Sequence, residues 1–144
     1  IADNMLRLSD RNISKLIGII TPDNKVRKKF IDALSCANPR LDNGKPPIQT
    51  FVSGQQETLD FLQGGIMVIN VQSCKGLEFD TVILADIDQH VPRYDSHALK
   101  ARFYVMVSRA REHLMMLRTG DPFPKVDELL PTEKPSTPSI LIRK

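Results

Sequence analysis

The chain has 144 residues, 41% of them hydrophobic, and its 20 basic and 17 acidic side chains give a formal charge of +3. This length predicts about one domain with a hydrophobic core, and the small positive charge permits a nucleic-acid partner without requiring one. No signal peptide and no 18-residue apolar span occurs, which excludes the usual secreted and membrane-spanning patterns. Cys36 and Cys74 form no metal or redox motif, so we expect free thiols and a cytoplasmic location.

The first predicted elements are a strand and a helix. The apolar run at 15–24 is closed by Pro22 and Asp23, as expected of a strand buried on both faces. Residues 25–37 then place a hydrophobic stripe at helical spacing, made of Val26, Phe30, Ile31 and Leu34. The back of this helix is basic at 27–29; such a face is usually solvated, although it could add phosphate contacts.

A turn-rich segment at 38–47 leads into the middle of the chain, where short elements alternate. We expect a strand at 48–52, a helix at 54–65, and two strongly apolar strands at 66–71 and 81–87. Between the last two strands lies a charged loop that contains a glycine.

The last predicted elements are a helix at 95–114 and a strand at 114–119. We assign 1–120 to one domain and the proline-rich 121–144 to a tail or linker. The order β-α-β-α-β-β-α-β predicts an α/β fold with a mostly parallel sheet and helices on both faces. Ligands of such folds bind at the carboxyl ends of the strands, where the charged loop begins.

The loop sequence KGLEF combines groups that suit a nucleotide. Gly76 lets the backbone approach a phosphate or ribose, Lys75 supplies a cation, and Glu78 can accept hydrogen bonds from sugar hydroxyls. Leu77 and Phe79 would anchor the turn in the core. Taken alone, the motif is more often a solvated turn with a salt bridge.

A second motif, YVMVSRARE, ends the predicted helix 95–114. Arg109 or Arg111 could supply a guanidinium to a γ-phosphate. The alternative is a basic helix end that interacts favourably with the helix dipole. The three histidines, by contrast, have no metal-ligand spacing; we expect surface or capping roles for them and no metal site in this chain.

Together these motifs resemble a known family. VINVQSCKGLEFDTVILADID is similar to motif V of the UvrD/Rep-type superfamily 1 helicases, commonly T-x-H-x-x-K-G-L-E-F. FYVMVSRAREHLMML is similar to their motif VI, commonly Y-V-A-x-T-R-A-R, and Pro92 stands where the family has a proline between the two. IGIITPDNKVRKKFIDAL is compatible with motif IV. The resemblance covers about 15–119.

The resemblance implies the second of two RecA-like domains (a P-loop NTPase-type fold), with ATP bound between them. By position, Arg109 would contact the γ-phosphate as the catalytic arginine finger and Glu78 would bind the ribose. Gly76 would let the backbone come close, and Lys75 would hold the loop or reach a phosphate. Arg27 (or Lys28) would replace an arginine contributed by motif IV.

The resemblance also implies a nucleic-acid side. Asn70, Gln72 and Ser73 occupy the part of motif V that faces the nucleic acid, and Asn70 and Gln72 replace the usual Thr and His. Amides still hydrogen-bond phosphate or sugar, so we expect contact with single-stranded DNA, RNA not being excluded.

Two motifs that ATP hydrolysis needs are absent from the sequence. There is no G-x-x-x-x-G-K-[ST] and no Asp-Glu pair that ends a strand, so the phosphate cradle and the Mg²⁺ ligands must come from an N-terminal RecA-like domain. The start at Ile1 fits a domain cut from a longer protein. We therefore expect an ATP-dependent helicase or translocase whose C-terminal half is inactive alone. A non-catalytic RecA-like module that binds nucleic acid or protein is the second hypothesis.

Overall fold

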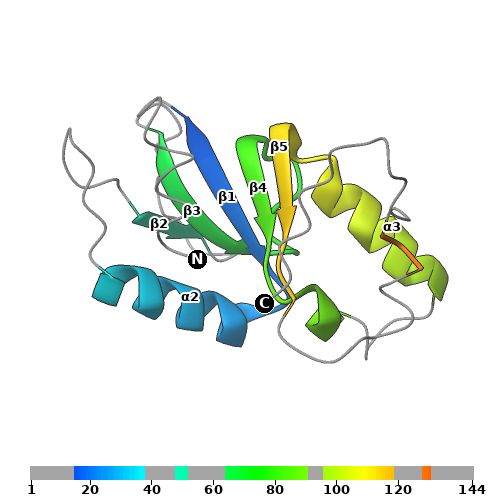
Figure 1. Ribbon diagram of the computed structural model, residues 1–144, viewed down its shortest axis with the longest axis horizontal. Helices are drawn as coiled ribbons and strands as arrows, with labels where there is room; N and C mark the ends of the chain where they lie inside the picture. The colour runs from blue at the N-terminus through cyan, green and yellow to red at the C-terminus, as the bar shows by residue number, and fades with distance from the viewer. Residues whose placement is uncertain (1–14, 38–47, 52–63, 91–95, 119–127, 131–144) are drawn as a thin grey trace, which may run out of the picture.

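A five-stranded sheet, parallel throughout, forms the centre of the molecule, in the order β2-β3-β1-β4-β5 (Figure 1). Its strands are β1 (Leu16–Thr21), β2 (Ile48–Phe51), β3 (Gly65–Asn70), β4 (Phe79–Leu84) and β5 (Ala110–Met116). The computed structural model describes residues 15–37, 48–51, 64–90, 96–118 and 128–130. The predicted α/β class with a mostly parallel sheet is confirmed.

The central strand β1 is buried along its whole length, as its continuous apolar run predicts. Ile19 lies in register with Val68 of β3 on one side and with Ile83 of β4 on the other. All three side chains are at most 1% exposed. Aliphatic packing between parallel strands therefore forms the middle of the core.

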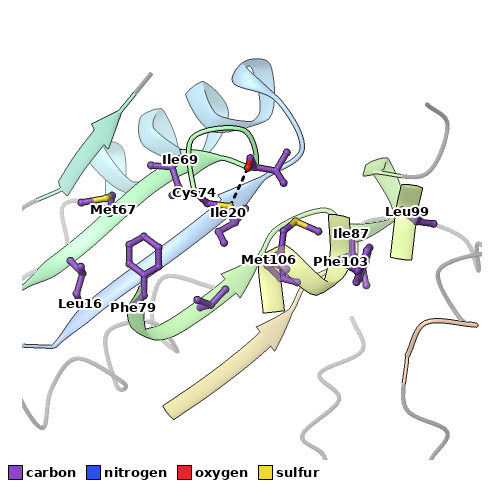
Figure 2. Close-up of a cluster of buried hydrophobic side chains, with 13 residues drawn as sticks. Leu16, Ile20, Met67, Ile69, Cys74, Phe79, Ile87, Leu99, Phe103 and Met106 are labelled. Carbon is purple, nitrogen blue, oxygen red and sulfur yellow. Dashed lines mark hydrogen bonds between the residues drawn. The ribbon is translucent and has the colours of Figure 1, made fainter. Parts of the chain in front are cut away.

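Helices cover both faces of the sheet, as predicted (Figure 1). Helix α2 (Asn24–Ala37) packs Leu34 against one face, among Ile17, Ile19 and Val68. Helix α3 (Ser96–Val107) covers the other face with side chains at i, i+4 and i+7, namely Leu99, Phe103 and Met106 (Figure 2). A short 3₁₀ helix, η1 (Ile87–His90), follows β4.

A glycine in β1 makes room for the largest side chain of the α3-covered face. A Cβ on Gly18 would lie 2.5 Å from the Phe79 ring, so the ring occupies the space that any other residue would fill. Phe79 is fully buried as the first residue of β4. The start of β4 is thus held by a close ring-to-backbone contact.

The link between β3 and β4, here called the crossover (71–78), is short for two parallel strands. β3 and β4 flank β1 and run the same way, so eight residues carry the chain from one end of the sheet to the other. Eight extended residues reach about 27 Å, and a six-residue strand spans about 20 Å. Val71 and Cys74 are buried in the cluster below α3, which shows that the crossover runs over that face.

Several predicted boundaries were wrong. The helix predicted at 95–114 ends at Val107, and β5 begins at Ala110, because Ala110 pairs with Phe79 of β4. Pairing with neighbouring strands also extends β4 back to Phe79, a residue assigned to the loop. Tertiary strand pairing here overrides local helical spacing. The helix predicted at 54–65 lies almost entirely outside the described residues.

The α3-covered side of the core also holds His90, Leu129 and Leu130. His90 was expected at the surface or in a cap, but it is 2% exposed, with its ring edge-on to Phe103 at 6.3 Å between ring centres. Its position after β4 puts it under α3, which a histidine's polarity does not predict. Leu129 and Leu130, in the segment predicted as tail, pack against the cluster below α3.

Candidate functional site

The predicted site residues lie at two opposite ends of the sheet. Because all strands are parallel, the sheet has an amino edge, where strands begin, and a carboxyl edge, where they end. Asn70 ends β3 at the carboxyl edge, whereas Glu78 directly precedes β4 at the amino edge. The loop begins at the carboxyl edge, as predicted, and its last residues lie at the amino edge.

The amino edge brings the two sequence motifs together. The Phe79 amide donates to the Arg109 carbonyl at 2.9 Å, which continues the β4–β5 pairing outward. This backbone contact places Glu78 and Arg109, 31 positions apart in the sequence, on neighbouring segments. The predicted ribose-binding and γ-phosphate-binding residues therefore share one edge of the sheet.

The Arg109 guanidinium lies over the end of α3. Nε donates to the Val105 carbonyl at 3.0 Å, Nη2 to the Ser108 hydroxyl at 3.1 Å, and Nη1 to the Leu77 carbonyl at 3.4 Å. The first contact caps a helix carbonyl that has no partner within the helix, and the positive charge suits the negative end of the helix dipole. The third contact ties the guanidinium to the crossover.

Glu78 forms an ion pair with a partner that the sequence analysis did not identify. Arg111 Nε and Nη2 approach Glu78 Oε2 at 3.1 and 3.0 Å. The two side chains are 60% and 56% exposed, so water screens the pair and its contribution to stability is small. The predicted salt bridge of the loop is thus present, and Arg111 is its partner. The pairing of β5 with β4 brings Arg111 next to Glu78. The sequence analysis missed this contact because it assigned Arg111 to a helix.

Lys75 and Gly76 are exposed on the crossover. Gly76 has a φ of 82°, in the left-handed region that favours glycine, and no atom lies within 4 Å of a Cβ placed there. The backbone conformation therefore requires this glycine, while the space beside it is open to an approaching group.

The middle of the crossover is anchored by Cys74. Its thiol donates to the Val71 carbonyl at 3.1 Å (Figure 2), and its side chain is fully buried. Burial raises the pKa of the Cys74 thiol, and the nearby Arg109 charge opposes this effect. The thiol is therefore a structural anchor of the crossover, whereas Cys36 is exposed.

At the carboxyl edge, Asn70 turns inward. Its Nδ2 donates to Asn24 Oδ1 at 2.8 Å, and its Oδ1 accepts from the Ser73 amide at 2.8 Å. Asn70 and Ser73 are only 6% and 7% exposed, whereas Gln72 between them is exposed. Of the three residues predicted to contact nucleic acid, Gln72 is therefore the one that presents its side chain to solvent.

Arg27 lies at the carboxyl edge. Its Nε donates to Asn24 Oδ1 at 3.1 Å, and its Nη1 contacts the Thr50 hydroxyl in β2. The structure thus does not bring Arg27 beside Glu78 and Arg109, the other residues predicted for the nucleotide. It joins the network of Asn24 and Asn70 instead.

Buried polar groups also follow β4 at the carboxyl edge. Asp86 is 2% exposed, with a left-handed φ of 49°, and burial raises the pKa of its carboxyl while Lys29 opposes the rise. Burial, and then the Arg102 charge, lowers the pKa of His90 to about 4. His90 is therefore neutral at pH 7. Arg102 itself donates to the Pro22 carbonyl at 3.0 Å.

The described part of the chain contains no group of three or more His, Cys, Asp or Glu side chains arranged to hold a metal ion. No helix within it combines the length and the apolar character that crossing a membrane takes.

Comparison with known proteins identifies the segment that carries both motifs. Residues 65–117 match the family model of the UvrD-like helicase C-terminal domain, a segment that runs from β3 to the end of β5. The resemblance drawn from KGLEF and YVMVSRARE is thereby confirmed. No curated protein sequence gives a match.

Solved structures share the fold. One is the C-terminal domain of a possible DNA helicase from Lactobacillus plantarum WCFS1, with 22% identity and a TM-score of 0.60 over 86% of this chain and 68% of that one. Another is the arterivirus nonstructural protein 10, a helicase, in complex with DNA, with 14% identity and a TM-score of 0.47 over 86% of this chain and 29% of that one. The first shares the α/β fold with its mostly parallel sheet; the second is too distant to carry an argument.

Proposed function

We propose that this chain is the second RecA-like motor domain of an ATP-dependent superfamily 1 DNA helicase or translocase. The observation that carries the proposal is the meeting of two motifs at the amino edge. Both motifs lie within the segment that matches the helicase family, and the bond from the Phe79 amide to the Arg109 carbonyl places Glu78 and Arg109 side by side. An N-terminal RecA-like domain would face this edge across an ATP cleft.

In that cleft each residue has a distinct role. Arg109 is the arginine finger, which stabilises the charge that develops on the transferred phosphoryl group. Glu78 accepts hydrogen bonds from the ribose, Gly76 leaves room for close approach, and Lys75 supplies a cation. Mg²⁺ and the phosphate cradle belong to the N-terminal domain, so this chain alone does not hydrolyse ATP.

The crossover provides the connection between nucleotide and nucleic acid. Arg109 contacts the Leu77 carbonyl at one end, and the Ser73 amide contacts Asn70 at the other. When Arg109 moves onto a γ-phosphate, the contact at Leu77 is lost, and the crossover is free to shift. Single-stranded DNA at the carboxyl edge would sense that shift.

The test is Arg109→Lys in the parent protein that carries both RecA-like domains. Lysine keeps the charge but loses the planar fork, so we expect ATP turnover to fall by about 10³-fold or more, with single-stranded DNA binding changed less than about twofold. Lys100→Ala on the exposed face of α3 is the control. Wild-type turnover in the Arg109 variant would end the assignment.

The second candidate is a non-catalytic RecA-like module. The observation in its favour is that Arg109 already has three acceptors in the described structure, as a helix cap would. This candidate predicts that Arg109→Lys lowers stability and leaves ATP turnover of the parent protein unchanged.

A further inference from the structure

We propose that this domain binds the phosphate backbone of a single strand through the basic surface of α2, defined as Lys25, Lys28 and Lys29, and that Asn70 positions this surface instead of contacting the strand. The inference rests on the proposed function for the kind of partner. It departs from the assignment by motif, which places the contact on Asn70 and its neighbours.

The first argument is that Asn70 is already occupied. Its amide oxygen and nitrogen bond to the Ser73 amide and Asn24 Oδ1, both at 2.8 Å, and 94% of the residue's surface is buried. A direct contact with a strand would have to displace one of these bonds, although the Ser73 amide also donates to the Asn70 carbonyl and Asn24 Oδ1 also accepts from Arg27. Asn70 therefore links two segments of the protein, the crossover and the start of α2.

The second argument is the placement of the charges. Lys25, Lys28 and Lys29 are exposed and lie at i, i+3 and i+4, on one face of the helix. The bond from Asn70 to Asn24 holds the first turn of this helix against the carboxyl edge of β3. Exposed Gln72, two residues beyond Asn70, lies at the same edge. The three lysines thus present positive charge from one face of a helix whose first turn is fixed to the sheet.

The third argument is that this arrangement is costly for the helix itself. Like charges at i, i+3 and i, i+4 destabilise a helix, and cations near its N-terminus oppose the helix dipole. The first turn of α2 holds no acidic residue. A local cost of this kind is typical of a functional surface, where a polyanion would offset it.

Acidic groups also border the surface: Asp23 caps α2 by accepting from the Val26 amide, and exposed Asp32 lies four residues after Lys28 on the same helix face. Asp86 follows β4, and its carboxyl interacts with Lys29. In the described part of the chain, neither Lys25 nor Lys28 forms an ion pair. These two lysines therefore carry the larger part of the proposed phosphate contact.

The test measures the affinity of the 144-residue chain for a fluorescent 20-nucleotide oligo(dT) in a salt series. We expect Lys25→Gln and Lys28→Gln each to weaken binding about three- to tenfold, and the double variant to reduce the log–log salt slope by about 1.4. Lys100→Gln on α3 removes the same charge from the other face and should change little. The variants should weaken binding of oligo(rU) as much as binding of oligo(dT), because the proposed contact is with the phosphate backbone that both share.

Three results would overturn the proposal. One is no measurable binding by the wild-type chain at about 50 mM salt, where phosphate contacts are strong. Another is equal weakening by Lys28→Gln and Lys100→Gln. The last is tighter binding of another polymer than of oligo(dT). If that polymer is poly(glutamate), the surface binds an acidic protein partner; if it is a basic polymer, the surface binds no polyanion. ATP turnover is not involved, so failure of the motor assignment would leave these results interpretable.

Discussion

The two edges of the sheet present their polar residues in opposite ways. At the amino edge, Glu78 and Arg111 are exposed and form an ion pair in contact with solvent. At the carboxyl edge, Asn70 and Asp86 are buried, and the Asn70 side chain makes two internal hydrogen bonds. One crossover joins both edges, yet the same motif supplies solvent-facing groups at one end and structural groups at the other.

Position within a motif therefore does not determine whether a residue is accessible to a ligand. Glu78 can exchange its ion pair for another partner at small cost, because both states are hydrated. Asn70 can exchange its bonds only by breaking the contacts that link the crossover to the start of α2. Substitutions at the two edges should therefore act on different properties, nucleotide binding at one and stability at the other.

The largest effect is expected from Phe79→Ala, which removes the anchor of the amino edge. The fully buried ring fills the space above Gly18, and its loss should lower the free energy of unfolding by about 3–5 kcal/mol. Urea unfolding of the chain measures the change. Phe79→Leu should cost distinctly less. A loss below 1 kcal/mol for the alanine variant would mean that the amino edge does not depend on this ring.

Acid should weaken the carboxyl edge through His90. Its pKa falls from 6.5 to about 4 on folding, so its stabilising contribution is complete above pH 6.5 and is lost as the pH falls through 4. The difference corresponds to about 3 kcal/mol. Asp86 acts in the opposite sense, because its raised pKa makes protonation stabilising as the pH falls toward 3.8.

Urea midpoints at pH 7 and pH 4.5 test this pH dependence. His90→Phe keeps the ring next to Phe103 but removes the titration, so its midpoint should fall less between the two values. His97→Gln alters an exposed histidine and should behave as the wild type does. Equal pH dependence in all three proteins would exclude His90 as the cause.

Asn70→Ala should cost about 1 kcal/mol of stability, because the Ser73 amide and Asn24 Oδ1 each lose one of two hydrogen-bond partners. Gln72→Ala, at an exposed position of the same motif, should stay within about 0.5 kcal/mol. Thermal unfolding of both variants measures the contrast. An Asn70 variant of wild-type stability that has lost oligo(dT) binding would instead make Asn70 a direct contact.

The smallest effect on stability is expected from Arg111→Ala. The pair with Glu78 is more than half exposed, so its removal should change the free energy of unfolding by less than about 1 kcal/mol, and less still at high salt. Urea unfolding at low and high salt measures it. A salt-independent loss of about 2 kcal/mol in the free energy of unfolding would show that the exposed pair stabilises the fold as strongly as the buried groups of the carboxyl edge do.

Much of the fold could be predicted because apolar periodicity is a local property. Strand β1 and the buried faces of α2 and α3 follow directly from the spacing of residues such as Leu34 and Phe103. The end of α3 could not be predicted, since residues 108–111 continue the helical pattern. The pairing of Ala110 with Phe79 ends the helix, and that contact joins residues 31 positions apart.

For the candidate site, the sequence by itself determined which residue types were present and that KGLEF and YVMVSRARE belong together. Only the tertiary structure decided that Arg111 pairs with Glu78, that Asn70 faces inward, and that Arg27 lies at the other edge. The physical reason is that exposure and partners depend on strand order, and a crossover of eight residues moves a motif from one edge of the sheet to the other.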